Sequence, residues 1–272
     1  MFKGIYTAAS GMLAQQRKTE ILTNNMANAN TPGYKAEQTS IRSFPEMLMS
    51  AIGDTNVPVK KGLKLGQIRP VGNLSTGIYL QETMPNFNQG AVYETEFNTD
   101  FALIDGELPA GSSIFFRLSH PNGGEAYTRN GNFTLDGQGY LVTGDGYYVL
   151  SDTGARIQLP SEDFQVTEDG SVYVGNRRIA RIGVAFAQNA NRLVKEDNGL
   201  FRTENGQALP SAYGRANVTF GLKQRHLEGS NVDAAQSMAE LLTAYRAFEA
   251  NQKVVQAYDR SMDKAVNEIG KV

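Results

Sequence analysis

The hydrophobic pattern predicts a long helix at each end of the chain. Near the N-terminus, mostly apolar or small residues recur at alternating steps of three and four, at Ile5, Ala8, Met12, Gln15, Thr19, Leu22, Met26 and Ala29. A similar seam near the C-terminus runs through Met238, Leu241, Tyr245, Phe248, Gln252, Val255, Asp259, Met262, Val266 and Ile269. Such narrow seams are typical of coiled coils rather than of helices on a broad core.

The simplest arrangement pairs the two terminal helices with each other. A two-helix seam buries little apolar surface, so we expect the outer faces to contact further copies of the chain. A helical hairpin packed on its own domain fits the periodicity equally well. The predicted assembly interface comprises Ile5, Met12, Leu22, Met26, Met238, Leu241, Tyr245, Phe248, Val255, Met262 and Ile269.

The inner ends of both helices carry local signals. The first helix is expected to stop near Asn30, because Thr31 precedes a proline and is therefore disfavoured in the α region. Pro32 and Gly33 suit the two central positions of a type II turn. Ser230 followed by Asp233 resembles a capping box and predicts the start of the second helix.

The middle of the chain predicts an antiparallel β domain, a sandwich or an irregular barrel. Short runs of aromatic and β-branched residues alternate with glycine turns, and Asp-Gly pairs mark hairpins. The expected strands are 91–97, 101–104, 114–118, 127–135, 140–150, 164–167, 172–174, 179–188, 200–203 and 216–223. Five residues are expected in its core: Phe101, Ile114, Phe133, Leu141 and Phe186.

The predicted fold class is therefore mainly β with α, in three parts. Residues 1–35 and 230–272 form a discontinuous helical domain, residues 36–76 an extended linker, and residues 77–229 the β domain. Within the linker, residues 41–52 hold enough apolar residues for a short helix, and residues 54–69 read as a loop or extended arm.

Composition narrows the function classes. The formal net charge is -2 and cysteine is absent, which argues against a nucleic-acid partner and excludes disulfides, thiolate catalysis and Cys-ligated metals. The N-terminus does not read as a cleavable signal. No apolar run approaches the ~18 residues of a membrane helix, so no membrane insertion is expected.

Candidate chemistry is sparse. Asp136-Gly137 and Asp145-Gly146 lack the spacing of a calcium loop and read as turns. His120, in a segment that resembles an exposed turn, and His226 are the only histidines and carry no triad or metal-site spacing. The 28 acidic residues allow a carboxylate pair in space, but no local pattern marks one. We expect no catalytic, cofactor-binding or metal-binding residue.

Asparagines cluster unusually in the last turns of the first helix, at Asn24, Asn25, Asn28 and Asn30. Asparagine competes with the helical backbone and favours caps and turns. The cluster is therefore either a set of amides capping a frayed helix end or a polar belt between neighbouring copies.

Three blocks of sequence resemble the axial proteins of the bacterial flagellum, the rod and hook family. The first is Asn24 to Lys35. The second is a middle pair, which comprises Phe87-Asn88-Gln89-Gly90 with Thr95, Asp100, Ala102 to Ile104 and Gly106, and Arg129 to Asp136 with Gly139 to Val142. The third begins Leu227-Glu228-Gly229-Ser230-Asn231-Val232-Asp233. The chain looks most like the rod-type hook–basal body proteins, near the distal rod protein in length, although residues 107–113 form a longer loop than the family pattern has. The linker at residues 36–76 is similar in place to the rod-type insertion of the family. The family signature falls on Asn24, Asn25, Asn28, Thr31, Pro32, Gly33, Tyr34, Gly229, Ser230, Asn231 and Val232.

This resemblance implies a structural role without catalysis. Family members place their terminal helices in an inner tube around the export channel and their β domain outside. They leave the cell through the flagellar type III export apparatus without cleavage, assemble with copies of themselves and with neighbouring rod and hook proteins, and transmit torque in the basal body. A monomeric β-domain binding module and a cell-wall-acting hydrolase are the alternatives.

Overall fold

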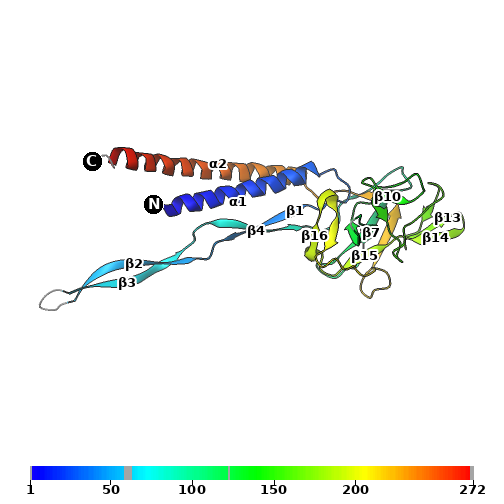
Figure 1. Cartoon of the computed structure of the whole chain (residues 1–272), viewed down its shortest axis with the longest axis horizontal. Helices are drawn as coiled ribbons and strands as arrows, with labels where there is room; N and C mark the ends of the chain where they lie inside the picture. The colour runs from blue at the N-terminus through cyan, green and yellow to red at the C-terminus, as the bar shows by residue number, and fades with distance from the viewer. Residues whose placement is uncertain (1, 58–62, 122, 270–272) are drawn as a thin grey trace. The chain divides into compact units, whose positions relative to one another are not determined.

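The computed structural model describes residues 2–57, 63–121 and 123–269 (Figure 1). The chain forms two compact units. Unit 1 comprises Met1–Asn24, Gln38–Met84 and Ala235–Val272, and unit 2 comprises Asn25–Glu37 and Pro85–Ala234. Mainly β structure with a helix near each end is what the hydrophobic pattern predicted.

Unit 1 contains most of both long helices and two β ribbons. Helix α1 spans Phe2–Ala27, helix α2 spans Ala234–Lys264, and a π-helical turn covers Ala265–Ile269. The first helix ends three residues before Asn30. Strand β1 (Glu37–Ser43) pairs with β4 (Ile78–Pro85), and β2 (Met47–Val57) pairs antiparallel with β3 (Leu63–Leu74).

The predicted short helix over residues 41–52 is wrong, because β1 and β2 occupy this range. Pro45 lies inside it, and a proline there removes a helical hydrogen bond and clashes with the preceding turn. Phe44 instead stacks on Tyr79 of β4, with ring centroids 5.1 Å apart. The predicted loop or arm at 54–69 is largely the two strands of the β2–β3 hairpin; residues 58–62 of it lie outside the described part.

Unit 2 is built on an open eight-stranded sheet. Its strand order is β16-β17-β8-β7-β11-β10-β9, with β15 also paired to β7. The bounds are Ser113–Ser119 (β7), Glu125–Thr128 (β8), Phe133–Leu135 (β9), Leu141–Thr143 (β10), Tyr148–Val149 (β11), Val184–Ala187 (β15), Leu193–Lys195 (β16) and Phe201–Thr203 (β17). Because this order has two ends, the sheet does not close into a barrel.

Three smaller sheets complete unit 2. They are the β12-β13-β14 sheet and the pairs β18-β6 and β19-β5. Their strands are Val92–Glu94 (β5), Phe101–Asp105 (β6), Gln165–Val166 (β12), Ser171–Val174 (β13), Arg177–Arg181 (β14), Phe220–Gln224 (β18) and His226–Glu228 (β19). Two 3-10 turns, Ala190–Arg192 and Asp197–Gly199, flank β16.

The expected strands and the observed ones differ in detail. The long runs 127–135, 140–150 and 179–188 each contain two strands with an intervening break, and β16 and β19 were not predicted. The Asp136-Gly137 pair lies in the hairpin between β9 and β10, and the Asp169-Gly170 pair lies in the hairpin between β12 and β13. Short glycine-containing breaks inside an apolar run leave the hydrophobic pattern unchanged, so they escape a pattern-based reading.

The core of unit 2 lies on both faces of β7. Ile114 and Phe116 belong to the main buried cluster, which also holds the other four predicted core residues, Phe101, Phe133, Leu141 and Phe186. Phe115 points to the opposite face and packs with Tyr127 and Phe201 in a second cluster. Since successive side chains of a strand alternate between faces, burial of three consecutive residues places β7 at the centre of the unit.

Candidate functional site: a buried charged junction and exposed helix faces

The Pro32-Gly33 turn fixes the chain where it leaves α1. The Tyr34 amide donates to the Thr31 carbonyl at 3.3 Å, and Gly33 has φ +67°, as the predicted type II turn requires. The Gly33 amide donates to the backbone oxygen of Glu228 at 2.7 Å. A methyl group on Gly33 would lie 2.5 Å from the Arg129 carbonyl carbon, so the turn packs directly against backbone of the β domain.

Four charged side chains meet beneath this turn. The Lys35 ammonium donates to Glu228 Oε1 and to the Asn88 carbonyl, each at 2.7 Å. Arg129 Nε donates to Glu228 Oε2 at 2.9 Å. The Arg129 guanidinium also binds both carboxylate oxygens of Asp105, at 2.8 and 3.1 Å. The side chains of Glu228 and Arg129 are fully buried and that of Lys35 is 1 % exposed. We call Lys35, Asp105, Arg129 and Glu228 the charged junction.

The charges of the junction alternate and balance, which is what makes their burial tolerable. Burial alone would raise the pKa of Glu228, but the cations of Arg129 and Lys35 outweigh it and hold that pKa below its usual value. Burial and the neighbouring Arg129 charge lower the pKa of Lys35, against the opposing pull of Glu228. Glu228 is therefore the shared counter-ion of two buried cations.

Two asparagines of the signature act as backbone clamps. Asn25, 4 % exposed, accepts from the Tyr34 hydroxyl and the Glu37 amide and donates to the Glu37 carbonyl. Asn231 accepts from the Ala36 amide at 2.7 Å and donates to the Asn86 and Asn88 carbonyls. Asn25 therefore fixes the end of α1 to the segment that follows it, and Asn231 joins that segment to residues 86–88.

The remaining signature residues are less central. Asn28 accepts from the Thr31 hydroxyl at 3.2 Å, and Asn24 lies on the exposed side of α1. The Gly229 amide donates to the Ala91 carbonyl. The Ser230 hydroxyl accepts from the Val232 amide, and α2 begins only at Ala234, so the predicted capping box at Ser230 is wrong.

Sequence reasoning missed the charged junction, although three of its residues lie in the quoted blocks. Lys35 ends the first block, Arg129 begins the second middle segment and Glu228 belongs to the last block, while Asp105 lies between the matched Ile104 and Gly106. The only local signal is a charge beside strand-forming residues, as in Thr128-Arg129 and Leu227-Glu228. Such a charge is far more often solvated than buried.

The helices of unit 1 contact each other through small residues of α1. A methyl group on Gly4 would lie 2.1 Å from the Tyr258 hydroxyl, and one on Gly11 would lie 3.0 Å from the Asn251 amide nitrogen. Lys18 Nζ lies 3.4 Å from Glu240 Oε2. Since low numbers in α1 meet high numbers in α2, the helices run antiparallel, as Figure 1 shows.

The covered stripe of α2 differs from the predicted seam in more than half of its positions. Less exposed residues recur at steps of four and three, at Ser237, Leu241, Ala244, Phe248, Asn251, Val255, Tyr258, Met262 and Ala265. Leu241, Phe248, Val255 and Met262 are shared with the prediction. Met238 and Tyr245 are 46 % and 52 % exposed, and the side chain of Ile269 lies outside the described part. In α1, Leu22 is buried, Ile5 and Met12 are half-buried, and Met26 is 36 % exposed.

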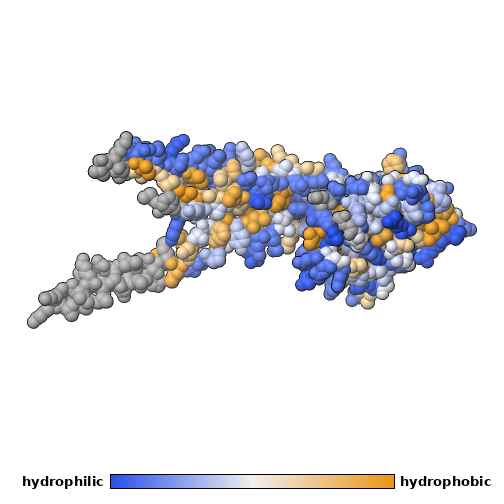
Figure 2. All heavy atoms as spheres, viewed as in Figure 1, coloured by the Kyte–Doolittle hydropathy of each residue, from blue (hydrophilic) through white to orange (hydrophobic). Residues whose placement is uncertain are grey.

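Apolar side chains therefore remain at the surface of unit 1. Figure 2 shows apolar residues along both helices, and those of α2 include Met238, Leu242 and Tyr245, at helical spacings of four and three. We call these three residues the outer stripe.

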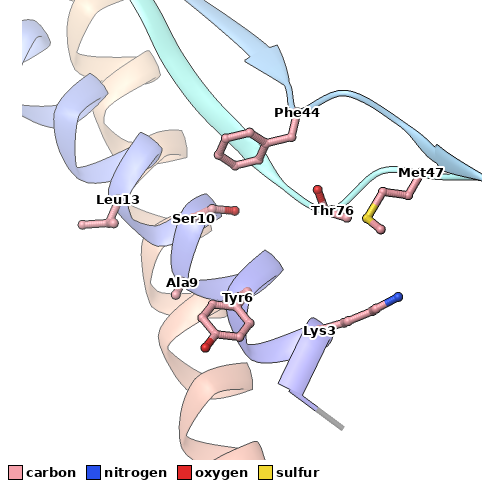
Figure 3. Close-up of a pocket in the computed structure, with 8 residues that line it drawn as sticks. All are labelled: Lys3, Tyr6, Ala9, Ser10, Leu13, Phe44, Met47 and Thr76. Atoms are coloured by element: carbon pink, nitrogen blue, oxygen red, sulfur yellow. The ribbon is translucent and has the colours of Figure 1, made fainter.

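A groove of about 580 Å³ lies between α1 and the strand ribbon of unit 1 (Figure 3). Tyr6 and Leu13 line it from α1, and Phe44 and Met47 line it from the ribbon. All four of these side chains are more than a third exposed. Unit 1 thus carries apolar surface that is not covered within the described part of the chain.

The two histidines have separate surroundings. His120, predicted in an exposed turn, has a side chain only 9 % exposed; it stacks on Tyr147 and lies 3.4 Å from Glu196 Oε2. His226 Nδ1 lies 2.8 Å from the Gln224 carbonyl oxygen. Within residues 2–57, 63–121 and 123–269, no three His, Cys, Asp or Glu side chains are grouped so that they could hold a metal ion. In the same ranges no helix is both long and apolar enough to cross a membrane.

Comparison with known proteins gives matches along the whole chain. Residues 5–35 match the model for flagella basal body rod proteins, residues 111–174 the D1 domain of flagellar hook proteins FlgE/F/G, and residues 223–268 the C-terminal region of basal body rod FlgEFG proteins. The flagellar hook-basal body complex protein FlhO of Bacillus subtilis (strain 168) is 43% identical over 279 residues, covering all of both chains.

Two further relatives have similar coverage. The flagellar basal-body rod protein FlgG of Bacillus subtilis (strain 168) is 30% identical, over 98% of this chain and 99% of its own. The flagellar basal-body rod protein FlgF of Rhizobium meliloti (strain 1021) is 32% identical, over 99% of both chains. Together with the three matched regions, these relatives show that the chain belongs to the family of flagellar basal-body rod and hook–basal body proteins.

Proposed function

We propose that this protein is a structural subunit of the flagellar basal-body rod. It assembles helically with copies of itself and with neighbouring rod and hook proteins around the export channel, and it transmits torque. The observation that carries the proposal is the uncovered outer stripe of α2, in a chain whose full-length relatives are named as rod and hook–basal body proteins.

The outer stripe and the covered stripe share one helix, and this suits a subunit that contacts copies on more than one side. Exposed apolar side chains at regular helical spacing indicate a protein interface more often than a monomer surface. A contact between two different surfaces of identical chains generates an open helical filament when its rotation does not close into a ring. In our proposal, residues 1–35 and 230–272 form the inner coiled-coil layer, residues 77–229 the outer layer, and residues 36–76 the rod-type insertion between neighbours.

The charged junction supports the same role from inside the subunit. It fixes both the segment that follows α1 and the segment that precedes α2. A load on the helices therefore passes into the β domain through buried ion pairs and backbone hydrogen bonds. The groove beside Tyr6 and Leu13 offers a further surface for a neighbouring axial subunit. Export through the flagellar type III apparatus, without cleavage, places the subunit outside the cytoplasm.

Localisation tests this proposal directly. A short epitope inserted at the exposed turn around Gly206, in a strain carrying this copy alone, should co-purify with hook–basal bodies while the cells still swim. A Tyr245→Asp variant that carries the same epitope at the same turn should be absent from the purified hook–basal bodies. A tagged protein found only in the cytoplasm, or normal swimming after deletion of the gene, would contradict the rod assignment.

The binding-module and hydrolase alternatives make different predictions. A monomeric binding module would show no concentration-dependent association in light scattering. A cell-wall hydrolase would need paired carboxylates of perturbed pKa in a cleft. The carboxyl group of Asp100 has a pKa raised by burial, but its neighbour in the structure is the Thr95 hydroxyl rather than a second acid. We therefore favour the structural role.

A further inference from the structure

Several of the contacts that hold the segment Thr31–Glu37 in place come from the far end of the chain. The Gly33 amide and the Lys35 ammonium both bind Glu228, and the Ala36 amide binds Asn231. Lys35 and Glu228 are 193 positions apart in sequence. The segment thus docks on a surface that is complete only when β19 lies on β5.

Glu228 contributes charge compensation to this docking as well as hydrogen bonds. Its carboxylate accepts from Lys35, Arg129 and the Gly90 amide. Without it, docking would bury Lys35 beside the Arg129 cation with Asp105 as the remaining acid of the junction. One positive charge would then be uncompensated in a site that excludes water, which is strongly destabilising.

We propose that Glu228 is an electrostatic interlock, so that the segment Thr31–Glu37 takes its place on the β domain only after Glu228 has taken its own. Any process that delivers the chain N-terminus first, including synthesis, presents Lys35 long before Glu228. The inner end of α1 therefore stays undocked until β19 completes the β domain, and it becomes fixed together with the inner end of α2. This inference concerns the folding of a single chain and does not rest on the rod assignment.

The test is hydrogen exchange on the full chain with Glu228→Gln, which keeps the shape and removes the charge. The amides of Gly33, Ala36 and Glu37 should exchange at least about 100-fold faster, while the amides of β7 and β15 stay protected. Glu94→Gln makes the same chemical change on an exposed carboxylate of the neighbouring strand β5 and should leave all of these amides unchanged.

The double variant Lys35→Met/Glu228→Gln separates an interlock from a general loss of packing. It removes the uncompensated cation and leaves the Arg129–Asp105 pair neutral, so protection of residues 33–37 should return to within about tenfold of the wild type. Unchanged exchange in Glu228→Gln would overturn the proposal, and so would equal acceleration across β7 and β15. If Glu228→Gln alone fails to fold, folding of the double variant supports the interlock, and its failure overturns it.

Discussion

Gly33 and Asn130 lie so close that a methyl group on the Gly33 α-carbon would stand 2.3 Å from the Asn130 amide nitrogen. The Gly33 φ of +67° is also one that residues with a side chain rarely adopt. The turn after α1 therefore needs glycine for two reasons, its backbone angle and its close approach to the β domain. Sequence alone gave the first reason and could not show the second.

Gly33→Ala should destabilise the protein by about 3 kcal/mol, through a left-handed backbone and a clash that only backbone movement relieves. Gly214→Ala is the matched control, because Gly214 has φ +69° with open space around it, and it should cost only about 1 kcal/mol. Urea unfolding followed by circular dichroism measures both. Equal losses would show that the close packing at Gly33 contributes nothing.

The charged junction should make the protein sensitive to acid. The folded-state pKa of Glu228 lies below its unfolded value, so the unfolded chain takes up the proton first as the pH falls. The stabilisation is full above about pH 4.3, the unfolded pKa, and is lost as the pH drops through the lower folded value. Lys35 and Arg129 are the cations that face Glu228.

Melting temperatures measured between pH 6 and pH 2.5 check the acid effect. The wild type should lose more stability over this range than Lys35→Met/Glu228→Gln does. Asp105 and Arg129 are present in both proteins, so the comparison isolates the Lys35–Glu228 pair. Parallel curves for the two proteins would mean that Glu228 is not held ionised in the folded state.

Tyr245→Asp should abolish motility while leaving the subunit folded. Tyr245 is 52 % exposed on the outer stripe, so a carboxylate there is solvated in the monomer and buried only on assembly. Ala257→Asp places the same charge at an exposed position of α2 that lies about 120° around the helix from Tyr245, and it should leave swimming normal. Soft-agar motility of sole-copy strains, with circular dichroism of the purified variants, provides the readout; normal swimming with Tyr245→Asp would exclude this face from assembly.

Leu241→Asp should differ from Tyr245→Asp by also loosening the helix pair. Leu241 belongs to the covered stripe, so the charge would be half-buried even in the monomer, at a cost of several kcal/mol. We expect lost motility, lower helical content and an unchanged β signal. A reduced β signal would show that α2 is part of the β domain's own core.

The terminal helices should exchange amide hydrogens faster than the β core in dilute protein. Their contact contains Gly4, Ala8, Gly11, Ser237 and Ala244, which bury little apolar area, whereas β7 is buried on both faces. Hydrogen exchange of residues 2–24 and 235–264 against residues 113–119 measures the difference. Equal protection would mean that the helices are stable without further copies.

Removal of divalent metal should not change the melting temperature. The sequence has no cysteine, and within the described ranges no acidic or histidine cluster could hold a metal ion. Thermal unfolding with and without a chelator checks this. A fall in melting temperature on chelation would reveal a metal site and weaken the purely structural reading.

The sequence by itself determined the local features of this protein. Periodicity placed both helices, Pro32-Gly33 placed the turn after the first, and Asp-Gly pairs placed hairpins of the β domain. All five core residues proposed from the pattern are buried. These features depend on residues close in sequence, whose spacing and backbone preferences act before any tertiary contact forms.

The tertiary structure decided the features that depend on distant partners. Ser237 and Ala244, rather than Met238 and Tyr245, lie on the covered stripe of α2, because the face that a helix covers is chosen by its partner and not by its own periodicity. The charged junction joins residues from four separate segments, and a charge has no periodicity that could reveal its partner. A lone Lys35 reads as solvated in the sequence and becomes a buried structural residue only because Glu228 folds onto it.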